Sequence, residues 1–426
     1  MENYSVVLII LAVMLGLSAV AEKIRLPYPV LLIVAGIAIG FIPSLPGVNL
    51  DPEVIFLIFL PPLLYDAAFN IPFQEFRTHI NTIGTLAISL VFLSASGIAV
   101  AARYMIPGMT WPLAFVLGAI LSATDAVAAL SVTRGLKLSH KTSVILEGES
   151  LVNDASALVA YRFAVAAVTG SAFVLWKASL QFLLLMGGGF LVGIAMGWLL
   201  RFILWWVRKN TLVTISFMLL MPFVAYQVAE ELHVSGVIAV VILGLSTAHF
   251  SRKVFPEGLK QQSKSFWDII IFILNGFIFI LIGLQFPYVL RTIDKSRLLP
   301  YTGYAFIITL VALLLRMARV FLQQINLQRA FNSKKGRRIS EHALLDFSTS
   351  LIVTWSGMRG IVSLATAIAL PLTLQNGQPF PLRSPIIFIS VAVVLFTIIG
   401  QGLTLPRIVK WLKAKELAKK DTASGS

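Results

Sequence analysis

The sequence predicts an all-α membrane protein that crosses the bilayer many times. Hydrophobic residues make up 58% of the 426 residues and charged residues only 12%, which is typical of polytopic membrane proteins. Most apolar runs exceed about 17 residues, the length that a helix needs to cross the hydrocarbon core, whereas a membrane barrel would show short alternating strands. Cysteine is absent, so disulfides and thiolate metal sites are excluded.

Polar segments and Pro/Gly breaks divide the chain into about thirteen candidate spans. They cover 4–20, 27–43, 53–69, 80–102, 111–132, 142–168, 178–200, 211–229, 234–250, 266–286, 300–325, 343–370 and 385–406. Most Lys and Arg residues lie in the loops after odd-numbered spans and in the C-terminal tail. By the positive-inside rule, the N-terminus is outside and the C-terminus cytoplasmic.

The polar segments outside the spans carry no sign of a second activity. The basic loop RAFNSKKGRRISEH (329–342) could bind nucleic acid or anionic lipid, but its place between two spans favours a solvated cytoplasmic loop. We therefore expect no nucleic-acid partner. The chain contains no GxxxxGK[ST] phosphate loop, and its five histidines do not form a metal site. We expect a protein that is not an enzyme, and any transport must run on an ion gradient.

Two spans contain polar interruptions. The fifth includes LSATDAVAALS (121–131), which places Thr124 and Asp125 in mid-membrane, and the twelfth includes TWSGMRGIVS (354–363), in which two glycines flank Met-Arg. Both spans are expected to unwind there. Because they are seven spans apart, an odd offset, spans 1–6 and 8–13 would have opposite orientations if they are structural repeats, with span 7 as the linker. Broken helices at matching positions of inverted repeats indicate a transport site near the bilayer midplane.

The sixth span contains an unusual run of polar residues, EGESLVNDASALVAYRF (147–163). A charged side chain at the bilayer centre costs about 2.5–3.5 kcal/mol on insertion scales, so it needs a partner or a wet cavity. Glu149 and Asn153 are four residues apart, as are Ser150 and Asp154, which places the four side chains on adjoining faces of one helix. This polar stripe must face protein or water.

Asp154 is the predicted exchange site, where a proton and a monovalent cation would compete for one carboxylate. The alternative is an acid that is structurally paired or permanently protonated. Neutral oxygen ligands beside it could come from Ser150, Asn153 and the break at Thr124. Asp66, in FLPPLLYDAAFN on the third span, could be a second carboxylate of the same cavity or an acid at a helix end.

The remaining charges in the spans have structural interpretations. Asp125 could touch the ion, but an acid at a helix break also compensates the free N–H groups of a half-helix, and we favour that role. Arg359 is the expected buried counter-charge for Glu149, in a structural ion pair. Glu147 has no assigned role, and Arg162 could pair with an acid or reach lipid phosphate.

Four segments together resemble the NhaP/NHE-like sodium/proton antiporters of the monovalent cation/proton antiporter superfamily. They are FLPPLLYDAAF (59–69), SATDAVAA (122–129), GESLVNDA (148–155) and SGMRGIVSLA (356–365). The resemblance covers nearly the whole span-bearing region and implies a homodimer with a thirteen-span fold in the lipid bilayer. The compact form, without a long regulatory tail, implies the cell (inner) membrane by analogy.

The resemblance also implies a division of the chain into a core that moves against a dimerisation domain. The implied parts are dimerisation residues 1–69 and 211–286, ion-binding core residues 80–168 and 300–406, a linker span 178–200 and a cytoplasmic tail 407–426.

The resemblance assigns roles to residues that match the family's motifs. They are the ion- and proton-carrying Asp154 with its neighbour Asn153, the Na+ ligands Ser150 and Thr124, the third-span acid Asp66, and the structural ion pair Glu149–Arg359. Ala126 departs from the family's usual Thr-Asp-Pro at the break, which leaves the unwinding of the fifth span open because Ala keeps the N–H that Pro lacks.

The implied activity is the exchange of Na+ or Li+ for H+, with no cofactor. A neutral Asn153 cannot carry a second proton, so the predicted exchange is electroneutral, one cation for one proton. Exchange of K+ for H+ on the same scaffold is the alternative. A cation channel would need a continuous pore and a repeated filter, which the sequence lacks, and a receptor without flux would leave the buried Asp154 unexplained.

Overall fold

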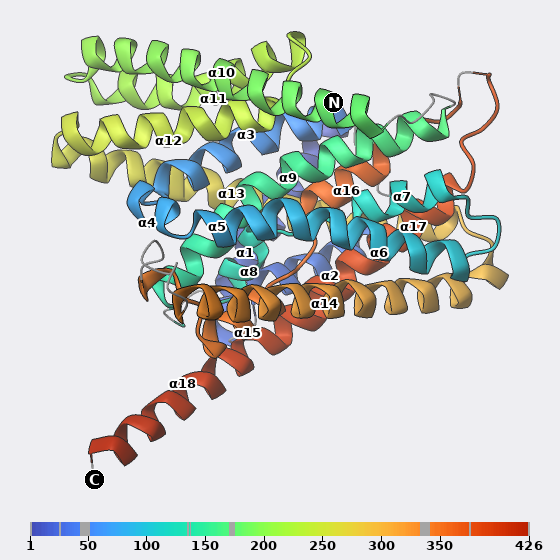
Figure 1. The fold of residues 1–426 in the computed structure, drawn as a ribbon. Helices are drawn as coiled ribbons and strands as arrows, with labels where there is room; N and C mark the ends of the chain where they lie inside the picture. The colour runs from blue at the N-terminus through green and yellow to red at the C-terminus, as the bar shows by residue number, and fades with distance from the viewer. Residues whose placement is uncertain are drawn as a thin grey trace.

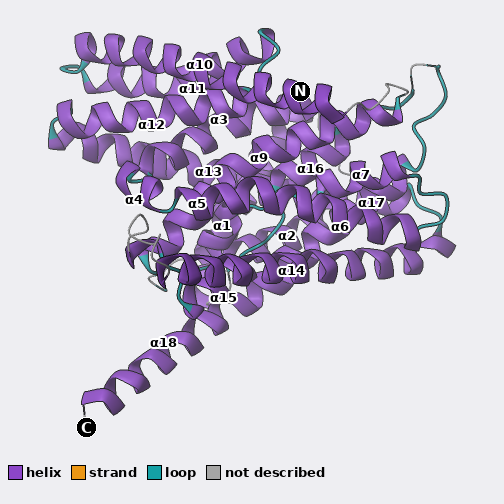
Figure 2. Ribbon diagram, in the orientation of Figure 1, coloured by secondary structure: helices purple, strands orange, loops and turns teal. Residues whose placement is uncertain are grey.

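The fold is almost entirely helical in the residues that the computed structural model describes, which are 2–24, 27–42, 52–133, 136, 138–169, 175–332, 341–374 and 376–424. Within these residues, the only β-pairing is an isolated bridge between Thr373 and Pro379, and no strand is drawn in Figure 2. Eight of the described helices are long and apolar enough to cross a bilayer, and four shorter apolar helices accompany them. The predicted fold class, an all-α polytopic membrane protein, is confirmed.

The first six candidate spans all fall on helices. In chain order the elements are α1 (Glu2–Ile24), α2 (Tyr28–Gly40), α3 (Pro52–Asn70), α4 (Phe73–Thr78), α5 (Ile80–Gly84), the π-helix η1 (Thr85–Ser89), α6 (Leu90–Met105), α7 (Trp111–Ile120), α8 (Ala126–Val132) and α9 (His140–Val168). The fourth span is built from α5, η1 and α6, and the short α4 before it was not predicted.

The remaining spans also fall on helices. They are α10 (Leu175–Val207), α11 (Thr211–Glu231), α12 (Gly236–Val254), α13 (Glu257–Arg291), α14 (Lys295–Asn332), the short η3 (Glu341–Ala343), α15 (Phe347–Trp355), α16 (Ile361–Ile368), α17 (Arg383–Phe396), the π-helix η4 (Thr397–Gln401) and α18 (Gly402–Ser424).

Several helices extend well past the apolar run that predicted them. α13 begins nine residues before its predicted span, with the sequence EGLKQQSKS, and α18 continues through WLKAKELAKK. Lys, Glu, Gln and Ala are good helix formers, so the helices continue where the apolar composition stops. Hydropathy predicts the part of a helix that lies in the membrane, and not its ends. Most of the basic loop 329–342 falls outside the described residues.

Both predicted helix breaks are present, and they contact each other. The fifth span breaks between α7 and α8, and the twelfth between α15 and α16. The backbone N–H of Asp125 donates to the carbonyl of Met358 over 2.8 Å. Arg359 Nε returns a hydrogen bond to the carbonyl of Leu121 over 3.1 Å. Each break thus supplies backbone partners to the other, which is necessary because unpaired peptide groups are costly inside a membrane.

The helices pack in groups that leave the two breaks in the middle of the molecule (Figure 1). α10 and α11 pack on α12, which packs on α3, while α2 packs along α13. On the other side, α6 packs on α7 and α14, and α17 packs on α14 and α16. The two groups of helices also contact each other, through α13 and α17 and through α3, which packs on both α9 and α16. The C-terminal part of α18 projects away from the rest of the molecule.

Candidate functional site

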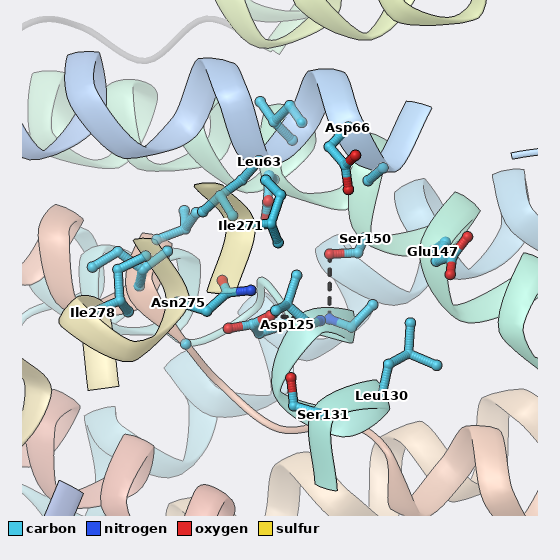
Figure 3. A pocket seen from close by; sticks show the side chains of 18 of the residues that line it. Leu63, Asp66, Asp125, Leu130, Ser131, Glu147, Ser150, Ile271, Asn275 and Ile278 are labelled. Atoms are coloured by element: carbon cyan, nitrogen blue, oxygen red, sulfur yellow. Dashed lines mark hydrogen bonds between the residues drawn. The ribbon is translucent and has the colours of Figure 1, made fainter. Parts of the chain in front are cut away.

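A cavity of about 510 Å³ lies where the α7–α8 break, α9, α3 and α13 meet. Its wall includes five of the predicted site residues, which are Asp66, Thr124, Asp125, Ser150 and Asp154. Figure 3 shows Asp66, Asp125 and Ser150 reaching the cavity from three different helical segments. The structure therefore brings together residues that are up to 88 positions apart in the sequence.

Asp154 lies on α9 and is only 9% exposed. Among the described residues, no side chain or backbone group donates a hydrogen bond to its carboxylate, and the charged group beside it is the acid Asp125. An ionised carboxylate without donors is strongly unfavourable in a buried place. The Asp154 carboxyl group is therefore open to a partner from the cavity that it lines.

Asp125 is the N-cap of α8. Its Oδ1 accepts hydrogen bonds from the backbone N–H groups of Val127 (2.8 Å) and Ala128 (3.2 Å). These bonds satisfy donors that the helix break leaves without partners, which is the structural role expected from the sequence. Close approach of the other break requires glycine at 360, because a Cβ atom there would lie 1.8 Å from Asp125 Oδ2.

Ser150 connects α9 to the break of the fifth span. Its hydroxyl donates to the carbonyl of Thr124 over 3.3 Å and accepts from the backbone N–H of Ala126 over 3.4 Å, the bond dashed in Figure 3. The Ala126 N–H, which a proline would lack, is thus used in the break. The span unwinds without proline because polar side chains of α9 and the second break bind the exposed peptide groups.

The predicted ion pair between Glu149 and Arg359 is wrong. Glu149 is 2% exposed and forms a two-pronged ion pair with Arg316 of α14, in which Nη1 lies 2.5 Å from Oε1 and Nη2 lies 2.8 Å from Oε2. Arg316 is itself 1% exposed and also donates from Nε to the carbonyl of Val353 over 3.0 Å. Planar guanidinium and carboxylate groups suit this bidentate geometry.

Arg359 is buried in the second break and binds backbone there. Its side chain donates to the carbonyls of Leu121 and Gly357, and its backbone N–H donates to Thr397 Oγ1 of η4 over 3.1 Å. Arg359 does not pair with Glu149 because the two unwound segments leave carbonyl oxygens without helical donors. A guanidinium located in the break binds those carbonyls, while the arginine of an unbroken helix pairs with Glu149.

Asn153 supports the break from behind the cavity wall. Its Nδ2 donates to Thr124 Oγ1 (2.7 Å) and to the Thr124 carbonyl (3.2 Å), and Thr124 Oγ1 donates to Glu149 Oε1 (3.0 Å). A continuous polar chain therefore runs from Arg316 through Glu149 and Thr124 to Asn153. The Thr124 hydroxyl is engaged in this chain, and Asn153 does not line the cavity. Their direct contact with a cation stays a prediction.

Acidic residues gather at one end of the cavity. Asp66 of α3 is half-buried and accepts a hydrogen bond from Asn70 over 2.9 Å. Glu147 of α9 and Asp268 of α13 line the same cavity. Asp66, Asn70 and Asp268 also line an adjoining cavity of about 460 Å³, whose wall includes Arg252, Lys260 and Lys264. The cavity thus continues toward a basic face of the molecule.

Arg162 lies away from the cavity, where its guanidinium forms an ion pair with Glu230 of α11 over 2.9 Å. An acid was one of the two partners considered for it. Both side chains are partly exposed, and such pairs contribute little to stability.

Three residues of this region were not predicted from the sequence. Arg316 is a charged residue in the middle of the eleventh span. This position indicates that it needs a partner, but it does not indicate which one. Asp268 and Asn275 both line the cavity from α13. Asp268 lies at the edge of a span, where charges are common, and the neutral Asn275 carries no charge signal. Only the packing of α13 against the cavity reveals these two.

Comparisons with known proteins identify the family and fold of the chain. Residues 8–411 match the family described as sodium/hydrogen exchanger, transmembrane. The chain is 34% identical to a sodium, potassium, lithium and rubidium/H+ antiporter of Bacillus pumilus, over 98% of this chain and 63% of the relative. It is 33% identical to the Na+/H+ antiporter ApNhaP of Aphanothece halophytica, over 96% of this chain and 75% of the relative.

Among solved structures, the sodium proton antiporter MjNhaP1 from Methanocaldococcus jannaschii at pH 8 has the same fold. It superposes with a TM-score of 0.71 at 21% identity, over 96% of this chain and 99% of that one. The chain spans 63% of the length of the B. pumilus relative and 75% of the length of ApNhaP. Because the family match covers nearly all of the helical region that forms the cavity, the chain belongs to the sodium/hydrogen exchanger family.

Proposed function

We propose that the chain is a secondary antiporter that exchanges Na+ or Li+ for H+, with cation and proton competing for Asp154. The observation that carries the proposal is a buried carboxyl group that faces a cavity shared with Asp66, Asp125 and Ser150 and accepts no hydrogen bond from the described residues. Such a group is stable when it is protonated or bound to a cation, and the two forms exclude each other. That exclusion is the chemical basis of exchange.

Ser150 is the best-placed neutral ligand, since its hydroxyl lies one helical turn from Asp154 on the same helix and lines the same cavity. The end of the cavity that holds Asp66 and Asp268, where it adjoins the smaller cavity, is called its mouth. Asp66 is proposed to receive the cation near this mouth. Asn153 cannot take up a proton, which favours an electroneutral exchange of one cation for one proton. The proposed sequence is binding at Asp154 from one side, movement of the core, and release on the other side.

The proposed moving core consists of 80–168 and 300–406, and the proposed dimerisation domain of 1–69 and 211–286, with 178–200 as linker. The packing of α6, α7 and α9 near α14, α16 and α17 supports the core as a unit. The acidic mouth lies toward the basic residues Arg252, Lys260 and Lys264. By the positive-inside rule this is the cytoplasmic side, so the cavity is proposed to face the cytoplasm, in a homodimer of the cell membrane.

Exchange of K+ for H+ is the second candidate. The B. pumilus relative is named for sodium, potassium, lithium and rubidium together, and hydroxyl and carboxyl oxygens bind all of these ions. The described residues that line the cavity do not form a closed shell of ligands that would select a cation by size.

The test is proton flux in sealed proteoliposomes, followed with a pH-sensitive dye after addition of Na+, Li+ or K+. We expect a cation-dependent pH change that is lost in Asp154→Asn, while that variant remains folded. Clamping the membrane potential should leave the rate unchanged if exchange is electroneutral. If no cation moves protons at any pH, the proposed function is wrong, and a response to K+ alone would favour the second candidate.

A further inference from the structure

One face of α13 forms a wall of the cavity from its mouth to its interior. The residues of this helix that line the cavity are Asp268, Ile271, Phe272, Asn275, Ile278 and Phe279. They recur at intervals of three and four, as expected for one face of an α-helix. Four of the six are apolar, so Asp268 and Asn275 are the polar members of this face. They are seven residues, or about two turns, apart.

Asn275 differs from Asp268 in its surroundings. Asp268 is exposed at the mouth, whereas Asn275 is 6% exposed. Within the described part of the chain, the side-chain amide of Asn275 has no hydrogen-bond partner, and Figure 3 shows it among the side chains that border the cavity, on the side of Asp125. A buried amide without a partner is unfavourable for folding. An apolar side chain like those of Ile271 and Ile278 would serve better if packing were its only role.

The amide is open to the cavity, so a water molecule or a bound ligand there can complete its hydrogen bonds or accept its oxygen as a ligand. Its carbonyl oxygen is a hard ligand of the kind that alkali cations bind, whereas an anion would meet Asp66, Asp125 and Asp154 in the same cavity. The site therefore suits a cation together with its remaining water molecules. It lies on a different helix from Asp154 and Ser150, so it can contribute a ligand from another wall of the cavity.

We propose that Asn275 is a further ligand of the transported cation, and that its carbonyl oxygen replaces a water molecule on the ion as it moves between the mouth and Asp154. This inference rests on the proposed function. It gives α13 a direct part in cation affinity. None of the four sequence motifs, which lie on the third, fifth, sixth and twelfth spans, includes a residue of this helix.

The test compares Asn275→Ala, Asn275→Leu and Asn275→Asp with the unchanged protein in proteoliposomes. We expect the Ala and Leu variants to raise the apparent KM for Na+ about tenfold, as for loss of one contact to a charged group. The maximal rate should change by less than about twofold. Asn275→Asp retains an oxygen at this position and should keep the apparent KM at or below the original value. Ile282→Leu, a similar-volume change at a buried position of α13 outside the cavity wall, is the matched control.

Thermal unfolding gives a second readout that does not depend on flux. Removing an unpaired buried amide should leave the unfolding temperature of the Leu variant equal or higher, while the stabilisation of the protein by added Na+ weakens. A purely structural asparagine would give the opposite pattern, with lower stability and an unchanged KM.

Three results would overturn the inference while the unchanged protein remains an active antiporter. The first is an unchanged apparent KM for Na+ in both the Ala and Leu variants. The second is a raised KM in the Leu variant alone, which would mean that the larger side chain obstructs the cavity. The third is a KM in the Asp variant that is raised as much as in the Ala variant. Absence of cation-driven flux in the unchanged protein would instead refute the proposed function itself.

Discussion

The pairing of Glu149 with Arg316 can be tested against the pairing with Arg359 by double-mutant cycles. Arg316→Met removes the bidentate partner and leaves Glu149 buried with the Thr124 hydroxyl as its remaining donor among the described residues. Breaking a buried ion pair in this way costs about 3–5 kcal/mol, because a buried charge is left uncompensated. In the background of Glu149→Gln no such charge remains. The same arginine substitution should then cost about 2–3 kcal/mol less, within the range of coupling seen for contacting residues.

The matched cycle uses Arg359→Met with the same Glu149→Gln change. Arg359 binds the carbonyls of Leu121 and Gly357, so its loss should destabilise the protein nearly equally whether residue 149 is Glu or Gln. The assay is the free energy of unfolding in mixed micelles, measured by titration with denaturing detergent and followed by tryptophan fluorescence. A coupling energy for Glu149 with Arg359 that equals or exceeds the one with Arg316 would refute the assigned pair.

Four further predictions follow from the cavity and its supporting contacts. Asp154→Asn should reduce cation-dependent proton flux to background in proteoliposomes while the unfolding temperature stays within a few degrees; a large loss of stability would mean a structural role. Gly360→Ala should lower the stability by about 1–3 kcal/mol, since its Cβ would lie 2.6 Å from Asp125 Cβ as well as 1.8 Å from Asp125 Oδ2; an unchanged unfolding temperature would contradict the close approach. Asn153→Asp places an oxygen against the Thr124 carbonyl, so we expect weaker folding and, if exchange persists, a rate that depends on membrane potential; a potential-independent rate would remove Asn153 as the determinant of stoichiometry. Because protons compete with the cation, the apparent KM for Na+ should rise by up to about tenfold for each unit by which the pH falls on the cation side, whereas a pH effect on the maximal rate alone would exclude competition.

The positions of the spans and of both breaks could be predicted because their signals are local. An apolar run of sufficient length predicts a span, and small and polar residues within the run predict unwinding. Asp125 is the clearest case, since a carboxylate followed by a short apolar segment is a capping signal that needs no knowledge of the rest of the fold. Asp154 also stands out locally, as a charge on a polar stripe within an apolar helix.

The partner of Glu149 could not be predicted in the same way. Arg316 and Arg359 are both arginines in the second half of the chain, and composition does not distinguish them. The choice depends on tertiary detail at Gly357, where an added Cβ would lie 2.5 Å from Arg316 Cδ. The absent side chain leaves room for Arg316 to reach Glu149. Asn275 was missed for another reason: a neutral amide in a span has little cost on hydropathy scales, and its importance appears only when the cavity is known.

The different surroundings of Glu149 and Asp154 on α9 support separate roles for them, in folding and in the proposed exchange. They are five residues apart, which places them about 140° apart around α9 at about 100° per residue. Glu149 therefore faces α14 and receives two hydrogen bonds from Arg316, while Asp154 faces the cavity, where no described group donates to it. The acid that is fully paired cannot exchange its partner without loss of stability. Asp154 is the proposed site for the proton or the cation, so neutralising Glu149 should act mainly on folding and neutralising Asp154 mainly on flux.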